Sequence, residues 1–138
     1  MSEPQVEGRG LVIPAAIRAE LLLWSLAVYP REACGLLVGR DGRVSSARLV
    51  RNLAQDPDRF ELDPVEHLRV ERWAERDGRE VLGAWHSHPD APARPSAADR
   101  AAAFAPWTHA ILSVDESSLL ELRCWSLVDG ELVEVRAD

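Results

Sequence analysis

Strand-length apolar runs alternate with stretches of helical periodicity along the 138 residues of this chain. Asp-Gly pairs at 41–42 and 129–130 are typical of tight β-hairpin turns, and Pro14 and Pro64 stand at favoured first positions of helices. The predicted strands are 11–13, 33–38, 44–53, 59–62, 80–85, 108–114, 119–128 and 131–135, and the predicted helices are 14–29, 64–77 and 96–104. This order predicts the α/β (α+β) class, in which helices flank a mixed sheet.

The length is that of one domain with its own hydrophobic core. Residues 1–10 are mostly polar and are expected to form a flexible lead-in, so the folded domain is expected to span 11–138. All 16 basic residues are arginine, a composition that suggests a bacterial source.

Acidic residues outnumber basic ones by 23 to 16, which gives a net charge of −7. Proteins that bind nucleic acids usually show the opposite balance. The longest apolar run, 21–28, is far shorter than the roughly 20 residues of a membrane span, and no signal peptide is recognisable. Cys34 and Cys124 are too few for a disulfide scaffold. We therefore expect a cytoplasmic protein with neither nucleic acid nor membrane as a partner.

The first predicted helix has more apolar surface than one buried face requires. Ile17, Leu21, Trp24 and Val28 form a stripe at helical spacing, and leucines at 22, 23 and 26 widen it. Either the helix is buried on two sides, or the extra surface is a self-association face and the protein is a homodimer.

Two of the four histidines stand at i and i+2 in His86-Ser87-His88. On a strand, alternate residues share a face, so both imidazoles can point to one metal ion. Asp99 is a third possible ligand, and two imidazoles with one carboxylate leave a position open, as in catalytic zinc sites. Ser96 lies three residues before Asp99. Taken separately, each feature has a simpler interpretation: paired surface histidines in a turn, and a capping box at a helix start.

These positions together give the pattern H-x-H-x7-S-x2-D, which resembles the JAMM motif of the MPN-plus metalloprotease family. That family also places a glutamate upstream, before a Gly-containing apolar run, and Glu32 precedes such a run at 33–39. The resemblance covers roughly residues 11–135 and implies the MPN fold, similar to that of cytidine deaminases. The deaminases' own H-x-E and P-C-x-x-C signature is absent.

The resemblance implies a role for each matched residue. His86, His88 and Asp99 would hold one Zn²⁺ per chain, which would make hydroxide available near neutral pH. Glu32 would be the general base, and Ser96 would donate a hydrogen bond to the oxyanion of the tetrahedral intermediate. The implied activity is that of a zinc metallopeptidase that hydrolyses peptide or isopeptide bonds without a covalent intermediate.

The chain is similar to the short prokaryotic members of the family, which act on small sulfur-carrier proteins. The resemblance therefore implies cleavage after the C-terminal Gly-Gly of a ubiquitin-like protein or its conjugates. We expect this tail to bind in a narrow groove beside a sheet edge, as an added strand. The alternative is a non-catalytic, MPN-like interaction or scaffold domain.

Three neighbours of the motif allow two interpretations each. Cys34 is either a buried structural thiol or part of the cleft wall. Trp85 belongs either to the core or to a substrate contact. Arg94, in the loop beside the motif, is either a solvated charge or a contact for a substrate carboxylate.

Overall fold

The computed structural model describes residues 10–104 and 106–138, so the predicted lead-in at 1–10 lies outside the described residues except for Gly10. The helices are α1 (Ala15–Val28), α2 (Pro64–Arg76) and α3 (Ala97–Ala102). The strands are β1 (Cys34–Arg40), β2 (Arg43–Val50), β3 (Glu80–Pro89), β4 (Thr108–Val114), β5 (Leu119–Val128) and β6 (Glu131–Val135). In this part of the chain, no helix is both long and apolar enough to cross a lipid bilayer.

All six strands form one mixed sheet in the order β2-β1-β3-β4-β5-β6. Asp41-Gly42 and Asp129-Gly130 have positive φ angles, as the predicted hairpin turns require, and they join β1 to β2 and β5 to β6. Among the paired strands of the described residues, β3 and β4 alone are parallel, and the segment that carries α3 makes the crossover between them. The predicted fold class is therefore confirmed.

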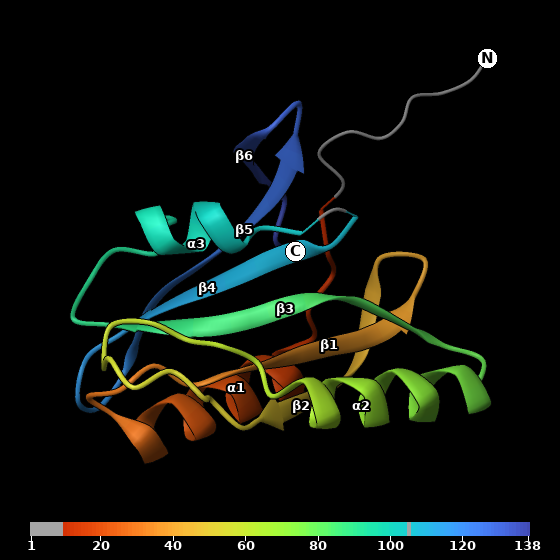
Figure 1. The fold of residues 1–138 in the computed structure, drawn as a ribbon, viewed down its shortest axis with the longest axis horizontal. Coiled ribbons are helices and arrows are strands. Elements are labelled where there is room, and N and C mark those ends of the chain that lie inside the picture. The colour runs from red at the N-terminus through yellow and green to blue at the C-terminus, as the bar shows by residue number, and fades with distance from the viewer. Residues whose placement is uncertain (1–9, 105) are drawn as a thin grey trace.

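Each face of the sheet carries part of the hydrophobic core. In Figure 1, α1 lies behind the sheet, whereas α2 and α3 lie in front of it. Trp85 of β3 is fully buried and packs in the core that contains Ile17 and Leu21 of α1. Its neighbour Ala84 lies in a second cluster with Val70 of α2. Side chains that follow Ala84 at alternate positions therefore face α2 and α3.

The predicted strand 11–13 is present only as single bridges. Leu11 pairs with Ala137, and Val12 pairs with Arg43. The segment contacts two strand ends in turn instead of lying along one, so it forms no ladder.

The predicted strand 59–62 is also reduced to one bridge, between Asn52 and Leu62. The Asn52 side chain forms hydrogen bonds with backbone groups that a longer strand pairing would use. Its amide nitrogen donates to the Arg59 carbonyl at 3.1 Å, and its oxygen accepts from the Glu61 N–H at 2.9 Å. Such side-chain bonds compete with regular strand pairing.

The ends of several elements also differ from prediction. β2 ends at Val50 rather than 53, since the next N–H, that of Arg51, donates to the Glu66 carboxylate at 2.7 Å. β3 continues to Pro89 because β4 pairs with it along its whole second half. α3 covers only Ala97–Ala102.

Burial of α1 on two sides is wrong as a prediction. Ile17 and Leu21 are buried, but Leu23 is 66% exposed and Val28 is 37% exposed. Leu22 and Trp24 pack against the core, but the apolar surface at Leu23 and Val28 is open to solvent, and its use in self-association stays a prediction.

Candidate active site

Two imidazoles and one carboxylate converge on the α2/α3 face of the sheet. His86 and His88 lie two residues apart on β3, and their Nε2 atoms are 3.1 Å from each other. Asp99 Oδ2, from α3, lies 3.2 Å from the His86 Nε2 and 3.0 Å from the His88 Nε2. The structure thus brings together all three predicted ligand residues.

The donor atoms fit a small cation. Zinc ligands about 2.0–2.1 Å from the metal in a tetrahedral arrangement lie about 3.3 Å apart, close to the spacing of this triangle. His88 Nδ1 is 2.8 Å from the Pro92 carbonyl, a contact that places the proton on Nδ1 and the Nε2 lone pair toward the cluster. Such a partner on the other ring nitrogen is usual for metal-ligating histidines.

Electrostatics also favour a charged carboxylate within the cluster. Burial opposes ionisation of Asp99, but its close contacts with the two imidazoles and the hydrogen bond from the Ser96 N–H hold the pKa of that carboxyl well below its usual range. Burial lowers the pKa of His86, so its ring is neutral, the form that binds metals.

Glu32 faces the same cluster from the segment just before the neighbouring strand β1. The Ser87 N–H donates to the Ala33 carbonyl at 3.0 Å, and the Ala33 N–H donates to the Ser87 hydroxyl at 2.8 Å, which fixes Glu32 beside β3. One ligand-type atom each from Glu32, His86 and His88 lie within 4.8 Å of one another. Glu32 is only 6% exposed, and its Oε1 has no hydrogen-bond partner among the described residues. Burial, opposed by the attraction of His88, raises its pKa to about 7, a value suited to a general base.

Ser96 forms the predicted capping box at the start of α3. Its hydroxyl oxygen accepts from the Asp99 N–H at 3.0 Å, and Asp99 Oδ2 accepts from the Ser96 N–H at 2.9 Å. The capping interpretation is therefore confirmed and is compatible with a ligand role for Asp99, because the box holds the carboxylate against the imidazoles. Capping uses a lone pair of the hydroxyl oxygen and leaves its hydrogen to donate elsewhere.

The loop that carries the Pro92 carbonyl is held by side chains that the sequence did not point to. The Ser113 hydroxyl donates to the Ala91 carbonyl at 2.5 Å, and the Ala93 N–H donates to a Glu121 carboxylate oxygen at 3.1 Å. The Tyr29 hydroxyl donates to Asp90, and the Trp125 indole N–H donates to the Ala93 carbonyl at 3.1 Å. These partners come from distant parts of the chain, so no local pattern marks them.

The three neighbours of the motif differ in their surroundings. Trp85 is fully buried, and its indole N–H donates to the Arg48 carbonyl at 3.2 Å, so the core interpretation is confirmed. Cys34 is also fully buried, and burial raises the pKa of its thiol to about 12. The same residue lines a recess together with Glu32, so both of its interpretations hold. Arg94 is exposed on its loop, and contact with a substrate stays a prediction.

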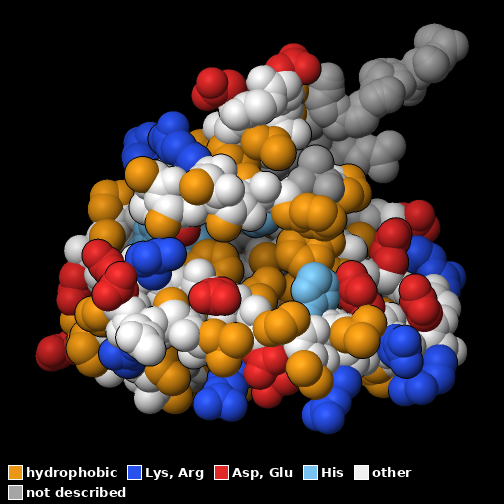
Figure 2. All heavy atoms as spheres, viewed as in Figure 1, with side chains coloured by type: hydrophobic (Ala, Val, Ile, Leu, Met, Phe, Trp, Pro, Cys, Tyr) orange, Lys and Arg blue, Asp and Glu red, His pale blue; other side chains and the backbone are white. Residues whose placement is uncertain are grey.

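The cleft lies over the face of the sheet, so the predicted groove beside a sheet edge is wrong. β3 is paired with β1 on one side and with β4 on the other, which leaves no free edge at the histidines. Figure 2 shows a hollow across this face with hydrophobic side chains gathered in it. Next to His86 and Asp99 the hollow contains an apolar cavity of about 210 Å³.

Comparison with known proteins gives a consistent set of relatives. The profile of the family described as "Prokaryotic homologs of the JAB domain" matches residues 14–128. The CysO-cysteine peptidase of Mycobacterium tuberculosis is 33% identical in an alignment of 133 positions, which covers 91% of each chain. A desampylase of Pyrococcus furiosus is 43% identical over 68 residues. That match spans about half the length of either protein, 49%.

Solved structures share the fold. Protein DSY2949 of Desulfitobacterium hafniense superposes with a TM-score of 0.81 at 31% identity, over 93% of this chain and 94% of that one. The JAB1/MPN domain protein AF2198 of Archaeoglobus fulgidus has a TM-score of 0.57 at 20% identity, over 96% of this chain and 100% of that one. The second likeness shows the fold alone.

Proposed function

The chain belongs to the family of prokaryotic homologues of the JAB domain. From that membership we propose that the protein is a zinc-dependent hydrolase, which cuts the amide bond after the Gly-Gly tail of a ubiquitin-like protein. The substrate is a small sulfur-carrier protein or its conjugates, and the domain responsible spans 11–138. One observation carries the proposal: a buried carboxylate, Glu32, faces a triangle of donor atoms from His86, His88 and Asp99. The names of relatives, CysO-cysteine peptidase and desampylase, support the substrate class.

His86, His88 and Asp99 would hold the metal. When bound, zinc supplies Lewis acidity and makes a water-derived nucleophile available at neutral pH. The chain's own contribution is to orient the two imidazoles and to keep one of them neutral. The Pro92 carbonyl accepts from the His88 Nδ1–H and so orients that ring, and burial lowers the pKa of His86 and so keeps that ring neutral.

Glu32 moves the proton. Its carboxylate takes a proton from the attacking water and passes it to the leaving amine, which departs neutral. A pKa of about 7 allows both halves of this transfer near neutral pH.

Ser96 stabilises the developing oxyanion. Its oxygen already accepts from the Asp99 N–H, which fixes the hydroxyl close to the donor triangle. The free hydroxyl hydrogen donates to the substrate oxygen as negative charge develops on it.

The two cysteines are free and buried, in keeping with the cytoplasmic location that we propose.

The proposed function is tested with carrier fusions. Purified protein is incubated with sulfur-carrier proteins of the same genome, each fused through its Gly-Gly tail to a reporter, with and without a chelator. We expect cleavage just after Gly-Gly, loss of cleavage with the chelator, and little activity on casein. Replacing Gly-Gly by Val-Val should abolish cleavage while the carrier stays folded. Equal cleavage of both fusions would contradict the substrate assignment, and no cleavage of any fusion would favour a scaffold role.

A further inference from the structure

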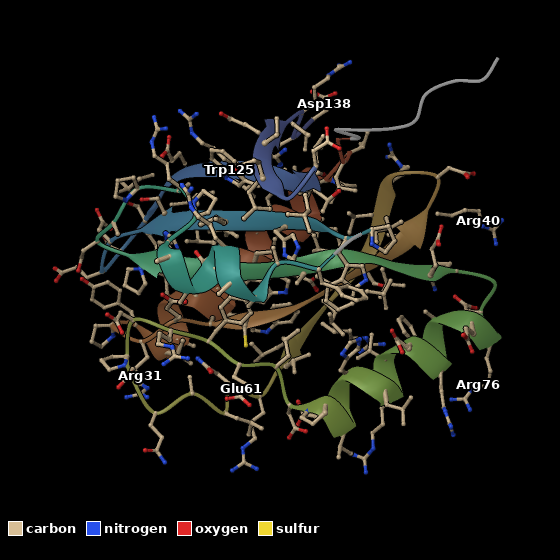
Figure 3. All side chains as sticks on the ribbon, turned by 45° about the horizontal axis from the view of Figure 1, so that its top comes forward. Arg31, Arg40, Glu61, Arg76, Trp125 and Asp138 are labelled. Atoms are coloured by element: carbon tan, nitrogen blue, oxygen red, sulfur yellow. The ribbon has the colours of Figure 1, made fainter. Side chains whose placement is uncertain are left out.

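The apolar cavity beside the donor triangle is large enough for a side chain. Its volume of about 210 Å³ exceeds the roughly 150 Å³ of an engineered protein cavity that binds benzene. Aromatic and aliphatic side chains line most of it: Phe60, Leu62, Trp107, Ile111, Trp125 and Leu132. They come from both sides of the hollow. In Figure 3, Trp125 lies above α3, whereas Glu61, from the segment between β2 and α2, lies below it.

This cavity opens directly onto the candidate active site. His86 and Asp99 form part of its wall, and the Phe60 ring stacks on the His86 imidazole with centroids 4.3 Å apart. A group bound in the cavity therefore lies next to two of the donor atoms.

Glu32 and the wall of the cavity formed by Ile111 and Trp125 lie on opposite sides of β3. Cys34 of β1 pairs with His86 on one side, and Glu32 precedes Cys34. Ile111 of β4 pairs with His86 on the other side, and Ile111 lines the cavity. The described cavity wall contains no part of Glu32, which instead lies in a separate recess with Cys34 and Val50.

This separation sets the direction in which the bound substrate crosses β3. The inference rests on the proposed function. Glu32 protonates the leaving amine, so the leaving group lies on the β1 side. The acyl portion of the substrate then runs over β4 and β5, across the cavity. Glycines at the last two positions have no side chains to fill it. We propose that the cavity is a specificity subsite for the apolar side chain of the residue immediately before the Gly-Gly.

The lining also predicts which side chains are rejected. Among the described residues of the cavity wall there is no arginine, while Glu61 and Asp99 are acidic. An acidic side chain would therefore lose its hydration without an arginine partner in the cavity wall, and it would lie near the Glu61 carboxylate. A leucine side chain would gain the free energy of apolar burial, and differences of this kind change affinity or kcat/KM about tenfold to hundredfold.

Binding of product peptides tests the subsite without relying on catalysis. Peptides that end in Leu-Gly-Gly, Ala-Gly-Gly or Asp-Gly-Gly with a free carboxylate are titrated into the zinc-loaded protein. Tryptophan fluorescence is the readout, because Trp107 and Trp125 line the cavity. We expect the leucine peptide to bind at least tenfold more tightly than the aspartate peptide, with alanine between them.

A filled cavity should remove this preference. Ala102 lies on the exposed surface of α3 and lines the cavity, so Ala102→Phe places a ring in it. Ala101→Phe is the matched control, since Ala101 is also exposed on α3 but does not line the cavity. We expect Ala102→Phe to weaken binding of the leucine peptide at least tenfold, and Ala101→Phe to leave it within twofold of wild type.

Cleavage of matched fusions tests the proposed subsite separately from the proposed function. One fusion series varies the residue before Gly-Gly, and a second varies the residue after the scissile bond. Equal binding and equal cleavage across the first series would overturn the subsite while the proposed function stands. A strong apolar preference in the second series only would place the cavity on the leaving-group side and would also overturn it. Selective peptide binding without cleavage of any fusion would sustain the subsite and reject the proposed hydrolase.

Discussion

At the scale of single residues, Glu32 is the side chain with the most specific expectation. It faces the donor triangle from the segment just before β1, and it is assigned to proton transfer rather than to metal binding. Glu32→Gln should therefore keep close to one zinc per chain and lose about 10²–10⁴-fold in kcat/KM. Metal analysis and the fusion assay measure the two effects. A glutamine variant within threefold of wild type would mean that the base lies elsewhere.

The ligand residues should behave in the opposite way. His88→Ala or Asp99→Ala removes one corner of the triangle, so each should lose most of its zinc during purification. His67→Ala is the control, because this histidine pairs with Glu71 on α2, outside the cluster. Zinc content that is unchanged in both ligand variants would refute the assignment.

At the scale of elements, the short helix α3 depends on one residue that has two proposed functions. Ser96→Ala removes the cap and the hydroxyl donor together, at a cost of about 1 kcal/mol in the free energy of unfolding and about 10²-fold or more in kcat/KM. Zinc should be retained.

Ser96→Thr separates these contributions, because threonine both caps and donates. Its stability should return to within a few tenths of a kcal/mol of wild type, and most of its activity should return with it. If Ser96→Ala lost stability but no activity, the residue would be a cap only.

The sequence predicted elements best where the determinants are local. Asp41-Gly42 and Asp129-Gly130 marked both hairpins, and Asp63 with Pro64 marked the start of α2, where the Asp63 carboxylate accepts from the Val65 N–H at 2.9 Å. The failures are non-local. The full length of β3 depends on pairing with β4, and the Asn52 side chain displaces a strand that the alternation at 59–62 favoured.

The candidate site shows the same division. Spacing alone suggested His86, His88 and Asp99, and Glu32 entered through a family resemblance, whereas the cavity and the side chains that hold the loop after β3 left no signal. Tyr29 and Asp90, for example, are far apart in the sequence and meet only in the fold.

At the scale of the whole molecule, the site should survive removal of its metal. Its imidazoles lie on a central strand whose pairing does not involve the ligands' side chains. Chelation should therefore leave the far-UV circular dichroism spectrum unchanged and preserve cooperative unfolding. The metal-free protein should melt about 10 °C lower, from a loss of about 3 kcal/mol at a hundredfold excess of zinc over its Kd. A spectrum that collapses on chelation would mean that the metal organises the fold, as in zinc fingers.

The central position of β3 also determines which conformational fluctuations can reach the site. Backbone amides near His86 are protected by β1 and β4 on either side, so they exchange with solvent deuterium only when the sheet itself opens. We therefore expect the amides around the imidazole ligands to be among the most slowly exchanging of the described residues, which hydrogen–deuterium exchange would measure. A conformational fluctuation that frays the outer strands β2 or β6 leaves the reaction centre in register. The positions of the two imidazoles are in this sense kept by the backbone hydrogen bonds that join β3 to β1 and β4.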